Sequence, residues 1–280
     1  MKDINAGKIT GAVKKLSMDA NYYLGEDVVR ALEKAAAKEE SPLGKEIINQ
    51  ILENAQIAAT EKMPLCQDTG LAAVFVEMGQ EVHVVGEGLE EAIQEGVRQG
   101  YGDGYLRKSM VEDPLRRKNT GDNTPAVISL KMVPGDKIKI TLLPKGGGSE
   151  NMSAIKMMKP SDGEAGVKDF VVETVRKAGG NPCPPIIVGV GIGGSFDKCA
   201  SLAKKALLRE VGSVHPDPYY AEMEKELLER INKTGIGPQG LGGRITALAV
   251  HIETHPCHIA SLPVAVNTQC HSARHKEIIV

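Results

Sequence analysis

The sequence has no tryptophan and only 3 phenylalanines and 6 tyrosines among its 280 residues. Aliphatic and methionine side chains must therefore fill most of any core, and a hydrophobic content of 41% is enough for a sizeable one. The chain also lacks an excess of positive charge, since its formal net charge is −2. No overall positive field can hold it on nucleic acid or on an anionic membrane, so any anion site must be local.

Long hydrophobic runs are missing as well. The longest, IIVGVGIGG at 186–194, is rich in glycine and far shorter than the roughly 20 residues of a membrane helix. The first twenty residues intersperse charges and never form the apolar core of a signal peptide. We therefore expect a cytoplasmic globular protein that associates with neither membranes nor nucleic acid.

The 5 cysteines are few, odd in number and widely spaced, and none forms a CxxC pair. In a chain without a secretion signal, this pattern argues against a disulfide framework. The cysteines could therefore bind a metal or act in catalysis. The first cysteine, Cys66, lies in the polar stretch MPLCQDTG at 63–70, which is an unusual setting for a thiol of the core.

The pattern along the chain predicts an α+β fold, with a helix-rich N-terminal part followed by mixed α/β segments. A β-hairpin is predicted around Pro134-Gly135-Asp136, because the second of the flanking runs alternates apolar and polar residues. No linker or repeat interrupts the chain, so we expect one domain over residues 1–280. The expected helices cover residues 26–38, 42–60, 89–98, 196–209 and a segment after 218; the expected strands cover 72–78, 127–133, 137–143, 186–190 and 246–252.

Two glycine-rich segments raise the question of a ligand. Gly189-Val-Gly-Ile-Gly-Gly194 reads as GxGxxG after an apolar strand, but REVGSVHPDPYY follows where a dinucleotide fold needs a second strand and an acidic residue. Nucleotide binding is therefore disfavoured. The three glycines 146–148 permit a close backbone approach to a ligand, and they are equally compatible with a flexible turn.

Histidines and cysteines cluster near the C-terminus in THPCH and QCHSARH. Because both residue types are zinc ligands, a zinc-binding interaction module is the alternative to an enzyme. The spacing of these histidines does not suit ligands of one zinc ion. An extended segment through His251 and His255 would separate them by about 13 Å, too far to share one ion.

The cysteines differ in their surroundings. Cys199 follows a helical apolar pattern and is expected to be a packed thiol, whereas Cys66, Cys183 and Cys270 lie in loops rich in prolines, amides and hydroxyls. The sequence assigns Cys257 to neither of these two groups. Three thiolates from distant loops suit a [4Fe–4S] cluster with one iron that has no protein ligand, and such an iron can act as a Lewis acid on a substrate hydroxyl.

Several ordered motifs carry a resemblance to a known family. They are PLCQDTG, LRKS, NTGDNTP, KGGGSENMS, NPCPP with GVGIGGS, and THPCHIASLPVAVNTQCHSARH. Together they resemble the α subunit, or N-terminal half, of class I iron–sulfur fumarate hydratases and the related L-tartrate dehydratases. The similarity runs in one order from about residue 41 to the C-terminus.

The resemblance implies a role for each matching residue. Cys66, Cys183 and Cys270 match the cluster ligands, and His258 and Asp68 match residues of the catalytic site. The residues matching substrate contacts are Gln67, Arg107, Gly146, Gly147 and Gly148. An arginine suits this task because its planar fork can bind a carboxylate through two hydrogen bonds.

The implied activity is the reversible hydration of fumarate to L-malate in the tricarboxylic acid cycle, with L-tartrate dehydration as the alternative. Members of the family that are single chains continue into a second catalytic domain. Since this sequence ends at Val280, the resemblance implies a separate β subunit that supplies a base and further substrate contacts, in a heterotetramer.

Overall fold

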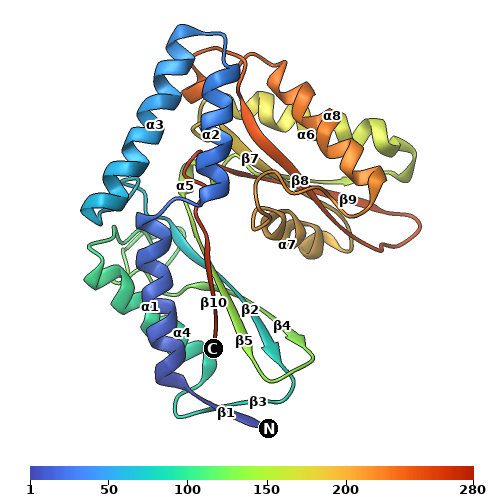
Figure 1. Cartoon of the computed structure of the whole chain (residues 1–280). Coiled ribbons are helices and arrows are strands. Elements are labelled where there is room, and N and C mark those ends of the chain that lie inside the picture. Colours follow the sequence, from blue (N-terminus) through green and yellow to red (C-terminus); the bar gives the residue numbers. More distant parts are fainter. The chain divides into compact units, whose positions relative to one another are not determined.

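The computed structural model describes all residues from 1 to 280 (Figure 1). Its helices and strands are intermixed along the chain, which confirms the predicted α+β fold class. The helices are α1 (Ala6–Tyr22), α2 (Glu26–Lys38), α3 (Pro42–Glu61), α4 (Leu89–Asp103), α5 (Gly147–Glu150), α6 (Gly163–Ala178), α7 (Phe196–Ala206) and α8 (Pro218–Asn232), with short 3₁₀ helices at Pro160–Asp162 and Pro238–Gly240. The strands are β1 (Lys2–Asn5), β2 (Leu71–Gly79), β3 (Val82–Val85), β4 (Val127–Val133), β5 (Ile138–Lys145), β6 (Ala154–Met158), β7 (Ile186–Gly193), β8 (Ala247–His255), β9 (Leu262–Gln269) and β10 (Lys276–Ile279). No helix combines the length and the apolar character that crossing a membrane requires.

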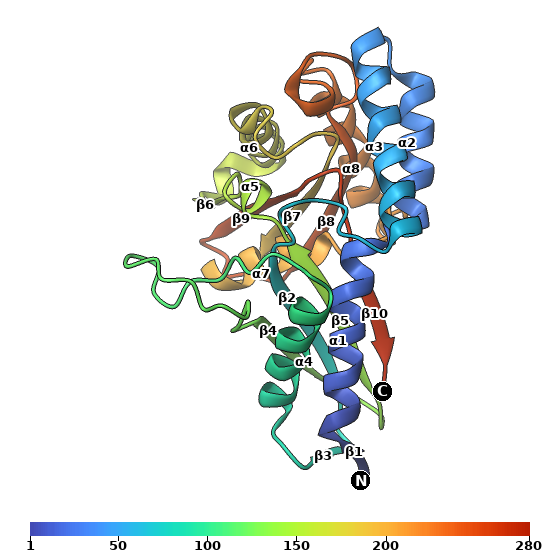
Figure 2. The ribbon, with the colours of Figure 1, turned by 90° about the vertical axis from the view of Figure 1, so that its left-hand side faces the viewer.

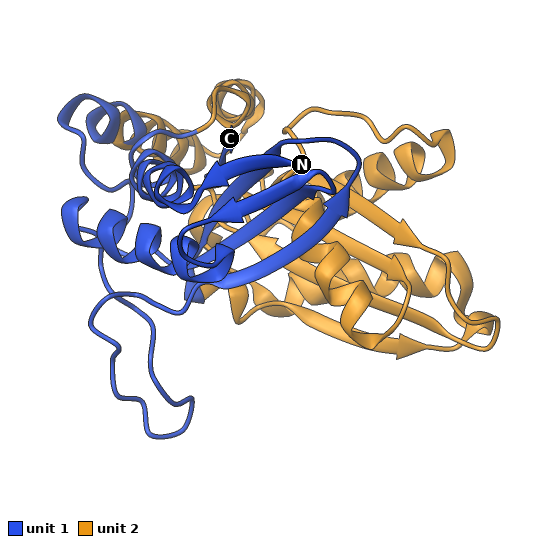
Figure 3. Cartoon of the chain, turned by 90° about the horizontal axis from the view of Figure 1, so that it is seen from below, with its two compact units in different colours: residues 1–24, 55–147, 274–280 blue, residues 25–54, 148–273 orange.

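The chain divides into two compact units, which Figure 3 shows in different colours. The first unit contains residues 1–24, 55–147 and 274–280, and the second contains residues 25–54 and 148–273. Each unit has its own four-stranded sheet and its own hydrophobic core.

The sheet of the first unit has the strand order β10-β5-β2-β4. Helices α1 and α4 pack together and contribute Ile9, Val13 and Val97 to a core shared with alternate residues of the central strands, such as Val74 and Ile140. A strand presents every second residue to the same face, so this alternation places the apolar side chains of β2 and β5 under the helices.

The two strands of the predicted hairpin exist, but they do not pair with each other. Strand β2 lies between them, parallel to β4 and antiparallel to β5. The turn after β4 instead closes over the end of β2, where the Gly79 N–H donates to the Lys137 carbonyl at 2.9 Å and the Gln80 N–H donates to the Val133 carbonyl at 2.8 Å. The predicted hairpin pairing is therefore wrong. The central place goes to β2 because most of its residues are buried, whereas β4 is exposed along most of its length.

The sheet of the second unit has the strand order β6-β9-β7-β8. Strand β7 runs parallel to β8 and antiparallel to β9. Its glycines allow α7 to pack closely, because a Cβ atom on Gly189 would lie 2.1 Å from the Ala203 carbonyl oxygen and one on Gly191 would lie 2.0 Å from that of Cys199. The GxGxxG pattern thus serves contact between a helix and the sheet.

Candidate active site

Two of the three predicted cluster ligands lie at the same end of the sheet in the second unit. Cys183 precedes β7 and Cys270 directly follows β9, and these strands are antiparallel neighbours with Ile187 opposite Gln269. The His271 N–H donates to the Cys183 carbonyl oxygen at 3.2 Å, which joins the two cysteine loops directly. Both cysteines are partly buried.

The backbone at Cys183 has a special conformation. Its φ of 55° lies in the left-handed region, which is uncommon for a residue with a side chain. A hydrogen bond from the Cys183 N–H to the Gly180 carbonyl oxygen at 3.0 Å, together with the bond from His271, holds this conformation. The loop therefore fixes the direction in which the cysteine side chain leaves the backbone.

The third predicted ligand, Cys66, belongs to the first unit and is partly buried. The Asp68 N–H donates to its Sγ atom at 3.4 Å. The Cys66 thiol in turn donates to the Gln67 Oε1 atom at 3.4 Å. The loop is fixed further by the Leu65 N–H, which donates to the Asn21 carbonyl oxygen at 2.9 Å.

The Asp68 carboxylate joins this cysteine loop to the glycine segment after β5. Its Oδ1 atom accepts the Gly70 N–H at 2.9 Å, and its Oδ2 atom accepts the Gly147 N–H at 2.8 Å. A Cβ atom on Gly146 would lie only 3.2 Å from Oδ2. The structure thus brings Asp68, Gly146 and Gly147 together. Gln67 is exposed in the same loop.

Three buried side chains support the loop from beneath. The Tyr101 hydroxyl donates to the Thr69 carbonyl at 2.8 Å, the Asn123 amide donates to the Gly70 carbonyl at 3.2 Å, and Arg274 Nη2 donates to the Asp68 carbonyl at 2.5 Å. Burial raises the pKa of Tyr101, so its hydroxyl remains a donor. None of these three residues was predicted from the sequence to belong to the site, although Asn123 and Arg274 lie in the motifs NTGDNTP and QCHSARH.

Arg107 is exposed, and its backbone is fixed to the cysteine loop. The Thr69 hydroxyl donates to the Arg107 carbonyl oxygen at 2.9 Å. Arg107 lies near the start of the long segment between α4 and β4, which extends away from the sheet in Figures 2 and 3. Asn123 accepts the N–H groups of Ser109 and Met110 with its Oδ1 atom, so one amide side chain links this segment to Gly70.

His258 lies in the turn between β8 and β9, and all residues from 254 to 260 are exposed. Its Nδ1 atom accepts the Ala260 N–H at 3.1 Å, and its carbonyl oxygen accepts the Ser261 N–H at 2.9 Å. This turn is at the opposite end of the strands from Cys183 and Cys270. The structure therefore does not bring His258 to the two cysteines of its own unit.

The remaining cysteines behave differently. Cys199 is buried against Ala203 and Ala265, and burial raises the pKa of its thiol, as expected for a packed residue. Cys257 is exposed, and its thiol donates to the Ser261 carbonyl at 3.3 Å. No group of three or more histidine, cysteine or acidic side chains is placed to hold a metal ion, and this holds for the predicted cluster cysteines as well as for the C-terminal histidines; His251 lies in extended backbone.

Comparison with known proteins decides the family. A family model described as fumarate hydratase (Fumerase) matches residues 10–279. The chain belongs to this family. The predicted resemblance is confirmed at this level, so the chain is a member of a family of hydro-lyases.

Relatives that resemble this chain carry another substrate in their names. A protein of Methanocaldococcus jannaschii, provisionally named as an L(+)-tartrate dehydratase subunit alpha, is 49% identical over 274 residues, which are 95% of this chain and 95% of that protein. The L(+)-tartrate dehydratase subunit alpha of Escherichia coli is 37% identical over 276 residues, or 98% of this chain and 91% of that protein. The protein of the same name from Shigella sonnei is 36% identical over 276 residues, with the same coverage.

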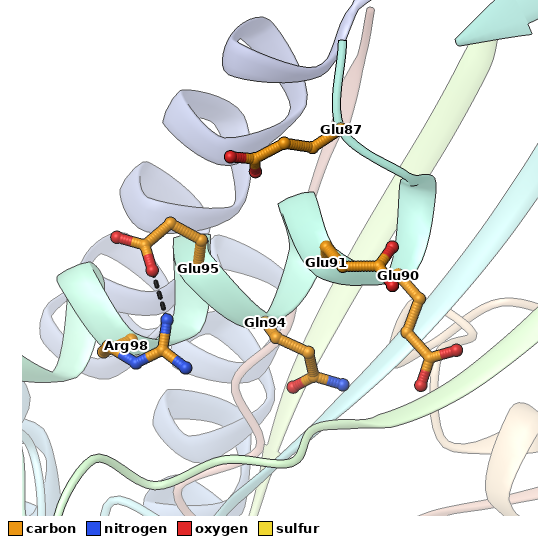
Figure 4. A pocket seen from close by; sticks show the side chains of 6 residues that line it. All are labelled: Glu87, Glu90, Glu91, Gln94, Glu95 and Arg98. Atoms are coloured by element: carbon orange, nitrogen blue, oxygen red, sulfur yellow. Dashed lines mark hydrogen bonds and ion pairs between the residues drawn. The ribbon is translucent and has the colours of Figure 1, made fainter. Parts of the chain in front are cut away.

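One groove of this fumarate hydratase family member is unsuited to a dicarboxylate. It lies along α4 and has a volume of about 590 Å³ (Figure 4). Its lining is acidic except for Gln94 and Arg98, and Arg98 is paired with Glu95 and Asp122. The lining residues are Glu87, Glu90, Glu91, Gln94, Glu95 and Arg98. Carboxylates of the protein would repel those of a substrate.

Proposed function

We propose that this chain is the α subunit of a hydro-lyase that carries a [4Fe–4S] cluster and interconverts fumarate and L-malate. The observation that carries the proposal is the hydrogen bond from His271 to Cys183, because it joins the two cysteine loops in a chain of the fumarate hydratase family. L-Tartrate is the second candidate substrate, and the names of the relatives favour it.

Cys66, Cys183 and Cys270 are the residues proposed to hold the cluster. The donor chemistry fits, because thiolates are the usual ligands of such clusters and the Asp68 N–H is directed at the Cys66 sulfur. When bound, the cluster would supply a Lewis-acidic iron that draws electron density from the substrate hydroxyl.

The proposed substrates are dianions at neutral pH, since carboxyl groups have pKa values of about 4. Arg107 is proposed to bind one carboxylate with its guanidinium group, and Gln67 to donate a hydrogen bond. The backbone of Gly146 and Gly148 would lie against the substrate, where the missing side chains permit close approach. Gly147 would act through Asp68, because its N–H donates to that carboxylate.

The chemical difficulty is removal of a proton from a carbon next to a carboxylate. Negative charge then spreads into that carboxylate, so cationic and N–H groups placed around it stabilise the transition state. Asp68 and His258 are proposed to assist proton transfer. Asp68 is held in place for this task by the N–H groups of Gly70 and Gly147.

The relatives are named as alpha subunits, and we propose that this chain likewise works with a β subunit. That subunit would supply the base that removes the carbon-bound proton, in a heterotetramer with two copies of each chain. The loss of a positioned base typically lowers the rate by roughly 10²–10⁴. The isolated α chain is therefore expected to turn over negligibly.

The test is an anaerobic titration of the reconstituted α chain with the β subunit. Malate and L-tartrate are supplied separately, and fumarate is followed by its absorbance while oxaloacetate is followed by a coupled reduction. Activity with malate that rises to a plateau at equal amounts of the two chains supports the proposal. A much higher kcat/KM for tartrate would replace fumarate hydration by the second candidate, and full activity without β would contradict the two-subunit proposal.

A further inference from the structure

We propose that a groove in the second unit binds a small organic anion with an apolar body. The groove lies between α2, α8 and the start of β8, and it has a narrow part of about 260 Å³ and a wider part of about 670 Å³. The two parts share the lining residues Lys38, Leu228, Asn232 and Ile245, so they form one continuous groove. Ligand pockets typically have volumes of roughly 300–1,000 Å³, so the groove is large enough for a small molecule.

One face of α2 gives the narrow part its charge. Arg30, Lys34 and Lys38 follow each other at intervals of four residues, so they lie in a row along one side of the helix. At a rise of about 1.5 Å per residue, this row is about 12 Å long. The one carboxylate in the lining of the narrow part is that of Asp27, whose Oδ2 atom accepts the Val211 N–H at 2.8 Å. The narrow part therefore carries an excess of positive charge.

Two of these cations are without an ion-pair partner. Lys34 and Lys38 are exposed and form no ion pair. Arg30 pairs with Glu26 at 3.4 Å and with Glu210 at 3.5 Å. The side chains of these two acids are 92% and 68% exposed, and ion pairs in such surroundings contribute little. All three cations can therefore contact a bound anion.

The floor of the groove is apolar. Ala31 and Ala35 present small side chains on the face of α2 that carries the cations, and Leu228 and Ile245 add larger apolar side chains. Ligand sites in general have such a lining, in which a few polar groups orient a ligand against apolar surface. An inorganic ion would leave this surface in contact with water. The ligand class is therefore a carboxylate or a phosphate ester that carries an apolar body.

The wall at the start of β8 is fixed by hydrogen bonds within the protein. Glu39 accepts the N–H groups of Arg244 and Ile245 at 2.9 Å and 2.8 Å. Asn232 accepts the Thr246 N–H at 2.8 Å. The groove is thus preorganised, which lowers the entropy that a ligand must give up on binding.

The wider part is less suited to negative charge. Glu39, Glu40 and Glu229 line it, and the Glu40 carboxylate pairs with Arg244 at 3.1 Å. These carboxylates repel an anion. The charged group of the ligand is therefore assigned to the narrow part, beside the lysines of α2.

The same wall supports the loop of Cys183. The N–H and the side-chain amide of Gln239 both donate to the Pro184 carbonyl oxygen, at 2.8 Å and 3.0 Å. Segment 239–245 thus joins the backbone next to Cys183 to Ile245 in the groove. A ligand packed against Ile245 should stabilise this segment and, through it, the cysteine loop.

Benzoate and phenyl phosphate are the probes, because each joins one apolar ring to a different anionic group. Broadening of their proton NMR signals during titration with the full chain measures binding. Benzyl alcohol lacks the charge and acetate lacks the ring, so both should bind far more weakly. The tighter of the two probes identifies the preferred anionic group. Binding of benzyl alcohol or acetate as tight as that of the probes would contradict the proposed ligand class.

Variants of α2 test the position of the site. Lys34→Gln combined with Lys38→Gln should weaken binding of the tighter probe by roughly tenfold or more, because two charged contacts are lost. Ala31→Leu should also weaken it, since the larger side chain fills the narrow part without changing the charge. Lys45→Gln combined with Lys177→Gln is the matched control, because both lysines are exposed and neither lines the groove. Unchanged binding in the first pair, or equal loss in the control pair, would overturn the proposal.

Two further measurements distinguish this groove from the proposed substrate site. Arg107→Gln should leave binding of the probe unchanged, and loss of binding in this variant alone would place the probe at the substrate site and overturn the proposal. Amide hydrogen exchange should slow in segment 239–245 and next to Cys183 when the probe is saturating, and unchanged exchange there would contradict the link to the cysteine loop. Because these experiments need neither cluster nor β subunit, their result stands whether or not the proposed function holds.

Discussion

The Asp68 carboxylate accepts the N–H of Gly147 at 2.8 Å, so the cysteine loop and the glycine segment after β5 are held together by one side chain. The other oxygen of the same carboxylate accepts the Gly70 N–H. Asp68 is thus fixed in position by two backbone donors, as its proposed role in proton transfer requires.

Asp68→Asn should lower kcat for malate by roughly 10²-fold or more, the usual loss when a positioned acid–base group is removed. The amide nitrogen of asparagine cannot accept an N–H, so either the bond to Gly147 or the bond to Gly70 is lost as well. Absorbance of the cluster should be retained. A variant with near wild-type kcat would show that Asp68 has only a structural role.

Replacement of Cys66, Cys183 or Cys270 by serine should prevent stable cluster assembly. The reason is that thiolates ligate the irons, and absorbance at about 400 nm after anaerobic reconstitution measures the result. Cys199→Ala and Cys257→Ala are the matched controls, since Cys199 is buried in a helix and Cys257 lies in the exposed turn. Equal loss of absorbance in a control would refute this choice of ligands.

Arg274→Met should destabilise the protein by roughly 1.5–3 kcal/mol, the range for a hydrogen bond to a charged group. The Arg274 guanidinium is buried and donates to the Asp68 carbonyl, which no methionine can replace. Urea unfolding gives the free energy of unfolding directly. Arg116→Met, at a side chain that is 87% exposed, is the control and should change it little. The same small change in both variants would argue against support of the loop by Arg274.

Stability at acidic pH should depend on Glu39. Burial would raise the pKa of Glu39, but N–H donation from the backbone of Arg244, Ser41 and neighbouring residues lowers it below its ordinary value of 4.5. Because the folded state keeps this carboxylate ionised to lower pH than the unfolded chain, its stabilising effect is complete above about pH 4.5 and is lost as the pH falls through the folded pKa.

Glu39→Gln should therefore reduce the free energy of unfolding at neutral pH and flatten its decline in acid. Urea titrations between about pH 7 and pH 3.5 measure both effects. Glu33→Gln, at an exposed position of α2, should leave both the value and its pH dependence unchanged. The same acid profile in wild type and Glu39→Gln would contradict this account.

Local patterns predicted the helices well where the end signals were clear. Helix α2 has the predicted ends, and α3 begins at Pro42 after Ser41, whose hydroxyl accepts the Gly44 N–H at 3.1 Å as a helix cap. Helix α1 was not predicted, although its buried residues Ile9, Val13 and Leu16 recur at helical spacing. The apolar spacing of this segment therefore indicated a helix, although in the sequence analysis its charged residues served only as evidence against a signal peptide.

Pairing between distant segments could not be predicted in the same way. The insertion of β2 between β4 and β5 depends on how much apolar surface each strand buries, not on the turn between the two later strands. The placement of Cys183 and Cys270 at the same end of the sheet likewise follows from the register of β7 with β9. Motifs identified candidate residues, whereas only the sheet shows which end His258 occupies.

The most direct test of the account compares activity with cluster content in the αβ complex. Samples reconstituted anaerobically to different extents are analysed for iron and acid-labile sulfide and assayed with malate, beside a complex that carries Cys270→Ser. Turnover should rise in proportion to iron and sulfide up to about four of each per α chain, and the variant should have neither cluster nor activity. Full turnover in samples without iron, or in the Cys270→Ser complex, would contradict the account.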